Sequence, residues 1–345
     1  MTTGKGLLLL GLMALAGPAR SDYSQHPQAA ALYAALKSEH GFSASDIDAV
    51  RAALVEANTI PSLIEAEQKA PERTETWTMY SAKRVDALRI KRGAQFIHDN
   101  RALLDRAETE YGVPGPVIAG VLGLETNFGR ITGGARVLDA LATQGFDHPT
   151  RTRFFFEELE QYFVFCRDFG FAPTQLKGSY AGAMGWAQFM PSNYRRLAVD
   201  FDGDGKRDLW SAADAIGSIA HYFTAYKPDL AWHRGEPLIV PAKLRAALAG
   251  SVEPNQKRAS YTVAQLRAAG VEPGARLPAN LAVGLIELQL DSGTLPAQQD
   301  KEYWIGLPNF YSVMSYNPRI YYAMTVSRLA SAMAAEAARL DPDLQ

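Results

Sequence analysis

The sequence predicts a mainly α-helical protein of the α+β class, because helix-forming composition dominates most of the chain. Residues 26–112 are rich in Ala, Leu, Glu, Lys and Arg, with breaks near Gly41 and Pro61. Residues 228–300 instead hold more Pro and Gly around short apolar segments, which is typical of a small mixed α/β insertion. Residues 319–340 return to a helical pattern, so helices should dominate the fold.

Stop signals and apolar runs place the individual elements. Four helices are expected between the N-terminal region and the insertion, over residues 85–111, 114–128, 152–168 and 212–226. Gly112 and Gly129 follow the first two, and glycine readily ends a helix in a left-handed turn. An Asp-rich loop over residues 200–208 precedes the last helix. Within the insertion, the short apolar segments are residues 238–240 and 281–290.

Composition excludes several classes of function. With a formal net charge of −2 over 345 residues, the chain has no basic field that would favour nucleic acid. Its single cysteine, Cys166, allows no intramolecular disulfide and lies in an apolar run, so we interpret it as a core residue. The six histidines form no HExxH pair, and no GxSxG or GxxxxGKS motif occurs, which disfavours zinc, serine-hydrolase and nucleotide chemistry.

The N-terminal residues 1–21 have the features of a secretory signal peptide. Lys5 supplies a positive charge, residues 6–16 are apolar, and small residues are spaced for cleavage after Ala19 or Ser21. The apolar stretch is too short to span a membrane, and an uncleaved anchor helix is the alternative interpretation. No cysteine follows it for lipid attachment. We therefore expect a soluble periplasmic protein without a membrane anchor.

A carboxylate lies on the apolar face of the helix expected over residues 114–128. At helical spacing, one stripe contains Ile118, Val121, Leu122 and Glu125. A carboxyl group in such a stripe loses solvation, which raises its pKa and suits it to act as a general acid near neutral pH. The alternative is a glutamate at a helix end that pairs with a nearby arginine, such as Arg130 or Arg151.

The segment around Glu125 resembles the catalytic-helix signature of the lytic murein transglycosylase B family. The resemblance keeps the family's order over about residues 76–335. It is carried by GLETNFGR at 123–130, RVLDALAT at 136–143, LKGSYAGAMGWAQFMPSNY at 176–194, SYN at 315–317 and YAM at 322–324. Because no cysteine follows its apolar N-terminal stretch, the chain resembles a soluble member of that family that is not a lipoprotein.

The resemblance implies a lysozyme-like α core with an additional α domain and a small β-containing insertion. The implied parts are a signal peptide (1–21), an N-terminal α region (22–112), a catalytic core (113–227) with an EF-hand-like loop (200–214), the insertion (228–300) and a C-terminal segment (301–345). The C-terminal segment would complete both the core and the α domain.

The resemblance also implies an activity. Enzymes of this family cleave the β-1,4 bond between N-acetylmuramic acid and N-acetylglucosamine in peptidoglycan and leave a 1,6-anhydromuramoyl end. Glu125 would act as the single acid and base, without a catalytic cofactor, whereas most glycosidases need two carboxylates. Implied partners are the glycan strands and proteins of the cell-wall machinery. The alternatives are a hydrolytic muramidase on the same core and a non-catalytic glycan-binding protein.

Further residues acquire expected roles by resemblance. Ser179 would bind the muramoyl acetamido group, while Gln188 and Asn317 would bind sugar hydroxyl or amide groups; capping of turns is the alternative. Arg151 would meet a peptide or lactyl carboxylate. Groove-lining side chains would be Phe189, Met190, Tyr222, Tyr316, Tyr322 and, with a weaker match around it, Tyr80; core packing is the alternative. We interpret Asp139 as a structural hydrogen-bond acceptor.

The Asp-rich loop resembles the opening of an EF-hand. Its metal ligands would be the side chains of Asp200, Asp202 and Asp204 and the carbonyl of Lys206. Ser211 stands where an EF-hand has its last glutamate, and by resemblance Asp214 supplies that carboxylate instead. The alternative is a solvated turn in which Ser211 and Asp214 form a capping box. We expect a structural Ca²⁺ here.

Overall fold

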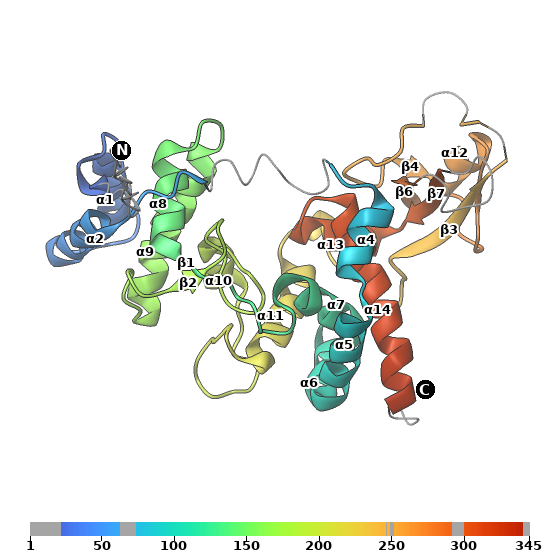
Figure 1. Cartoon of the computed structure of the whole chain (residues 1–345), viewed down its shortest axis with the longest axis horizontal. Helices are drawn as coiled ribbons and strands as arrows, with labels where there is room; N and C mark the ends of the chain where they lie inside the picture. The colour runs from blue at the N-terminus through green and yellow to red at the C-terminus, as the bar shows by residue number, and fades with distance from the viewer. Residues whose placement is uncertain (1–21, 63–73, 246, 249–251, 292–299, 341–345) are drawn as a thin grey trace, which may run out of the picture.

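The predicted class is confirmed: the protein is mainly helical, with a small sheet at one end of an elongated molecule (Figure 1). The computed structural model describes residues 22–62, 74–245, 247–248, 252–291 and 300–340. The predicted signal peptide lies outside these residues. Within the described ranges, no helix has both the length and the apolar character needed to cross a membrane.

The N-terminal helices pack against the middle of the chain (Figure 1). This layer consists of η1 (Tyr23–Gln25), α1 (Ala29–Ser38), α2 (Ala44–Glu56), α8 (Val137–Asp147) and α9 (Thr152–Phe169). Asp139 of α8 is buried and accepts hydrogen bonds from the Arg136 guanidinium at 2.7 and 2.8 Å and from the Asn58 backbone N–H at 3.0 Å. The interpretation of Asp139 as a structural acceptor is therefore confirmed. Cys166 of α9 is buried, and burial raises the pKa of its thiol to about 12, as a core residue requires.

A second group of helices surrounds the longest one, α14. The group is α4 (Trp77–Arg84), α5 (Ala87–Asp99), α6 (Arg101–Tyr111), α7 (Gly115–Thr126) and α14 (Ile320–Leu340). α14 packs along α4, α5 and α7. The prediction of one helix over residues 85–111 is wrong, because Asn100 separates α5 from α6. The Asn100 side chain donates to the Phe96 carbonyl at 2.9 Å and so competes with the helical backbone.

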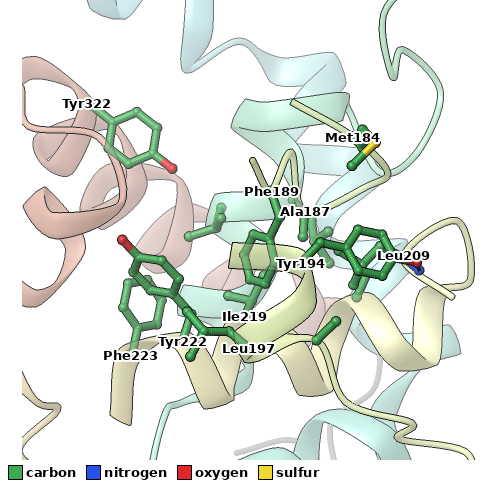
Figure 2. Packing of buried hydrophobic residues seen from close by; sticks show 14 of the residues in the cluster. Met184, Ala187, Phe189, Tyr194, Leu197, Leu209, Ile219, Tyr222, Phe223 and Tyr322 are labelled. Atoms are coloured by element: carbon green, nitrogen blue, oxygen red, sulfur yellow. Dashed lines mark hydrogen bonds between the residues drawn. The ribbon is translucent and has the colours of Figure 1, made fainter. Parts of the chain in front are cut away.

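Short elements in the middle of the molecule surround an aromatic core. They are β1 (Ala135–Arg136), β2 (Lys177–Gly178), α10 (Pro191–Leu197), α11 (Ala212–Ala225), η3 (Pro228–Leu230) and α13 (Pro308–Tyr316). Figure 2 shows Phe189, Tyr222 and Phe223 gathered in this core, with Tyr322 above them on α14. The predicted helices over 152–168 and 212–226 are confirmed as α9 and α11.

The insertion forms a five-stranded antiparallel sheet with a core of its own. Its strands are β3 (Ile239–Leu244), β4 (Tyr261–Thr262), β5 (Val271–Pro273), β6 (Ala282–Gln289) and β7 (Lys301–Gly306), in the order β4-β6-β7-β3-β5. α12 (Val263–Ala268) packs against it. The sheet includes β7, which follows the residues predicted for the insertion (228–300).

Candidate active site

Glu125 lies in the last turn of α7, on the stripe that the sequence predicts. The three apolar members of the stripe are completely buried, while Glu125 is only partly buried. Directly after Thr126, three consecutive residues have positive φ: Asn127, Phe128 and Gly129. Two of them are not glycines, so this sharp helix end is conformationally costly. Because the helix ends here, Glu125 lies in the last turn of α7 and not in the interior of a longer helix.

The surroundings of Glu125 favour the protonated carboxyl. Burial raises its pKa from 4.5 to about 7, and a hydrogen bond from Tyr322 opposes this shift. The Tyr322 hydroxyl donates to Oε1 at 2.6 Å. Within the described residues, Glu125 forms no ion pair and no other carboxylate shifts its pKa. The alternative that it pairs with Arg130 or Arg151 is therefore wrong.

Tyrosines from three helices form a cluster beside Glu125. The rings of Tyr316 and Tyr322 are parallel within 7°, with centroids 6.5 Å apart. The Tyr316 hydroxyl donates to the Ala187 carbonyl, and the Tyr222 hydroxyl donates to the Ser315 carbonyl at 2.7 Å. Burial raises the pKa of all three phenols, so they remain hydrogen-bond donors. The cluster places the Glu125 carboxyl in a largely apolar setting that favours its protonated form.

Ser179 and Gln188 order the loop between β2 and α10. The Ser179 Oγ accepts from the backbone N–H groups of Ala181 and Ala183, at 3.3 and 3.1 Å. The Gln188 amide donates to the carbonyls of Thr132 and Gly185, at 3.1 and 2.9 Å, and its φ is 51°. Both side chains therefore make the capping contacts that were the alternative to sugar binding.

A cleft of 820 Å³ runs from the tyrosine cluster toward the sheet. Four of the expected binding residues line it: Arg151, Met190, Tyr222 and Tyr316. Phe189 is only 2% exposed and packs beneath Tyr222 and Tyr316, so core packing describes it better than groove lining. Asn317 ends α13 beside the cleft residue Pro318, and its side chain makes no hydrogen bond to the described residues.

Tyr80 lies apart from the other expected residues. It is 4% exposed on α4, where it packs against Trp77 and Tyr321. The Arg84 guanidinium covers its ring, 3.6 Å from the ring centroid. These contacts enclose the side chain, so it does not line the cleft.

A buried carboxyl group in the lining of the cleft, that of Glu158, was not predicted from the sequence. Glu158 of α9 is 6% exposed and accepts from the Ser192 hydroxyl at 2.6 Å and the Ser192 backbone N–H at 3.0 Å. It thereby caps the first turn of α10 from outside. The available signal was the one used for Glu125, since Glu158 lies in the same helical stripe as the buried Phe155 and Tyr162.

The Asp-rich loop has a geometry that suits a hard cation. Carboxylate oxygens of Asp200, Asp202 and Asp214 lie within 4.8 Å of one another. Asp214 is buried and accepts from the backbone N–H groups of Phe201 and Asp208, both at 2.6 Å. Burial and the charges of Asp202 and Asp200 raise the pKa of Asp214. Converging oxygens that repel one another match the ligand preference of Ca²⁺.

The two remaining expected ligands are arranged less tightly. Asp204 is not part of the three-carboxylate group, and its Oδ1 accepts from the Lys206 backbone N–H at 2.8 Å. Ser211 accepts from the Asp214 N–H at 3.1 Å, which is half of the capping box considered as the alternative. The Asp214 carboxylate does not complete that box, because it accepts from the loop instead.

Fold and site together define the class of this protein: it is a lytic transglycosylase. The sequence profile described as "Transglycosylase SLT domain" matches residues 24–331, and the chain belongs to this family. It is 36% identical over 322 residues to membrane-bound lytic murein transglycosylase B of Escherichia coli K12, covering 91% of this chain and 84% of that protein. The predicted family is therefore confirmed.

Solved structures agree with the sequence comparison. Catenated SltB1 from Pseudomonas aeruginosa superposes with a TM-score of 0.82 at 37% identity, covering 92% of this chain and all of that chain (100%). The Escherichia coli lytic transglycosylase SLT35 in complex with calcium has a TM-score of 0.79 at 36% identity, covering 94% of this chain and 97% of that one. The lysozyme-like fold that the resemblance implies is confirmed.

Proposed function

We propose that this enzyme cleaves the β-1,4 bond between N-acetylmuramic acid and N-acetylglucosamine in peptidoglycan, with Glu125 as its only acid and base. The single observation that carries the proposal is the environment of Glu125: burial raises its pKa to about 7, and Tyr322 donates to its Oε1 at 2.6 Å. The relative named murein transglycosylase B supports peptidoglycan as the substrate class.

The proposed reaction needs only one carboxyl group because its proton returns to it. Protonated Glu125 donates to the glycosidic oxygen as the C1–O bond of the muramoyl residue breaks. The acetamido oxygen of the same sugar stabilises the cationic C1. Ionised Glu125 then takes the proton of the muramoyl 6-hydroxyl as that oxygen bonds to C1. The product is a 1,6-anhydromuramoyl end, no water is consumed, and Glu125 is protonated again.

The hydrogen bond from Tyr322 gives the two oxygens of Glu125 different tasks. Oε1 accepts from Tyr322 at 2.6 Å, which fixes the plane of the carboxyl group. Within the described residues, Oε2 has no hydrogen-bond partner. We infer that Oε2 carries the proton that is transferred. The same bond stabilises the ionised form, which the second step requires.

Two kinds of residue are assigned to the substrate: those that the family motifs supply and those that line the cleft. We assign the muramoyl acetamido group to the Ser179 hydroxyl and sugar hydroxyl or amide groups to Gln188 and Asn317. Met190, Tyr222 and Tyr316 line the cleft and offer faces for the apolar sides of sugar rings, with Phe189 as support beneath them. Tyr322 is 3% exposed and serves instead as the hydrogen-bond partner of Glu125. Arg151, which lines the cleft, would meet a lactyl or peptide carboxylate. Tyr80 is left out of this set because its neighbours enclose it.

We also propose a structural Ca²⁺ and a periplasmic location. The side chains of Asp200, Asp202, Asp204 and Asp214 and the carbonyl of Lys206 would hold the ion, and the calcium complex of the related SLT35 supports this assignment. The ion would supply charge neutralisation to the loop and no chemistry to Glu125. Residues 1–21 would direct export to the periplasm, where peptidoglycan lies.

Digestion of purified peptidoglycan sacculi tests the reaction. We expect residues 22–345 to release anhydromuramoyl products, identified by mass spectrometry, and the Glu125→Gln variant to release none. Reducing-end products, heavier by one water, would instead establish a hydrolytic muramidase and overturn the proposed proton cycle. Absence of products with the wild type would favour a glycan-binding role.

A further inference from the structure

The end of the cleft next to the sheet is cationic. Lys257 and Arg258 lie in the connection between β3 and β4, Lys227 follows α11, and Arg151 precedes α9; all four line the cleft and are exposed. The carboxyl groups in the same lining are Asp229 and Glu158. The lining therefore has more positive than negative groups, and its cations come from three separate parts of the chain.

Three of these cations, Lys227, Lys257 and Arg258, are available to an external anion. Within the described residues, no ion pair involves Lys227, Lys257 or Arg258. Glu158 offsets little of their charge, because both of its oxygens accept from Ser192 and burial raises its pKa. Low-dielectric walls around unpaired charges of one sign attract a counter-ion. Asp229 is the other carboxyl group of the lining, against four cations.

The segment that carries Lys257 and Arg258 is held in place on the sheet. Asn255 has a φ of 63°, and its side chain donates to the Glu287 carbonyl at 2.9 Å and accepts from the Glu287 N–H at 3.0 Å. The Asn255 N–H also donates to the Leu285 carbonyl at 2.8 Å. This clamp onto β6 presents both cations toward the cleft at a reduced entropic cost of binding.

We propose that Lys257 and Arg258, with Lys227 beside them, bind the carboxylates of the peptide attached to the muramoyl residue. This inference rests on the proposed function, because the peptide reaches the cleft only when a glycan lies in it. The tyrosine end of the cleft offers aromatic faces for sugar, and the cationic end offers charge. The cationic end therefore makes the enzyme prefer peptide-bearing strands over bare ones.

Two glycan substrates test this selectivity: strands that keep their peptides, and the same strands after enzymatic removal of the peptides. The ratio of kcat/KM between them is the readout. In the Lys257→Gln/Arg258→Gln variant we expect this ratio to fall about three- to tenfold, mainly through KM, as the loss of two solvent-facing ion pairs implies. Amidation of the peptide carboxylates should lower the wild-type ratio to a similar extent.

A matched control removes two other cations of the same domain. Lys243→Gln/Arg276→Gln changes exposed residues that do not line the cleft, and it should keep the wild-type ratio. An unchanged ratio in the Lys257→Gln/Arg258→Gln variant, with the wild type still forming anhydromuramoyl products, would overturn the inference and leave the proposed function intact. A preference that persists after amidation would show that other peptide groups are recognised.

A binding measurement covers the case in which the wild type cleaves neither substrate. Glu125→Gln is titrated calorimetrically with a disaccharide–tetrapeptide, with and without the two glutamine substitutions at Lys257 and Arg258. Weaker binding after those substitutions would support the cationic subsite although the proposed reaction had failed. Equal affinities would overturn the inference.

Discussion

At the scale of single residues, burial sets the raised pKa of Glu125 and a hydrogen bond from Tyr322 moderates it. The pKa of about 7 predicts that kcat/KM falls as the pH rises through 7, because the first step needs the protonated carboxyl. The hydrogen bond from Tyr322 lowers the pKa, since it stabilises the ionised form. Tyr322→Phe should therefore move this decline to higher pH, as measured in a pH–rate profile.

A second tyrosine serves as the control for this pH–rate experiment. The Tyr316 hydroxyl donates to Ala187 and not to Glu125, so Tyr316→Phe should shift the midpoint less than Tyr322→Phe. A decline that moves to lower pH in Tyr322→Phe would contradict the assigned role of the hydrogen bond. The midpoint is a sharper readout than the loss of rate, because any disturbance of packing lowers the rate.

At the scale of elements, the stability of the Asp-rich loop depends on how well the repulsion among its carboxylates is relieved. Asp200, Asp202 and Asp214 converge, and a bound cation would stabilise the folded protein by mass action. We expect a chelator to lower the wild-type Tm by about 2 °C, which corresponds to roughly 1–2 kcal/mol for a chain of this size. In Asp214→Asn this response should be lost, as measured by thermal unfolding with and without Ca²⁺.

A surface carboxylate elsewhere provides the comparison for the chelator experiment. Asp105→Asn removes an exposed charge on α6 and should keep the full response to the chelator. A wild-type Tm that does not change with Ca²⁺ or chelator would mean that the loop is held by its own backbone hydrogen bonds alone. The difference between the two conditions is the informative quantity, because Asp214→Asn also weakens contacts within the loop.

Local patterns predicted the elements better than they predicted the contacts between elements. The stripe around Glu125 was readable because helical periodicity alone decides which side chains share a face. The break at Asn100 was missed because one side-chain hydrogen bond outweighed a continuous helical composition. The enclosure of Tyr80 depends on Tyr321, which is remote in sequence, and no local pattern reveals such a contact.

At the scale of the whole molecule, α14 packs against both α5 and α7 and so joins the C-terminal helix to two earlier ones. Met333 is completely buried on α14 and approaches Gly93 of α5 and Gly123 of α7. Met333→Ala should destabilise the protein by about 2–4 kcal/mol, because it leaves a cavity where three helices meet. Chemical denaturation measures this loss.

A methionine at the surface provides the control, because its replacement removes the same residue type without leaving a cavity in the core. Met79 is 44% exposed on α4, so Met79→Ala should change the free energy of unfolding by less than about 0.5 kcal/mol. Similar losses for the two variants would show that the contact of α14 with α5 and α7 contributes little to stability.

The hydrogen bond between Tyr322 and Glu125 joins residues 197 positions apart in the chain. During synthesis the helix that carries the acid emerges well before the helix that carries its partner, and domains tend to form in the order of synthesis. A nascent chain that has not yet received α14 lacks the hydroxyl that orients the proton. The acid is therefore oriented only once α14 has packed against α7, and a copy that loses α14 to proteolysis loses that orientation.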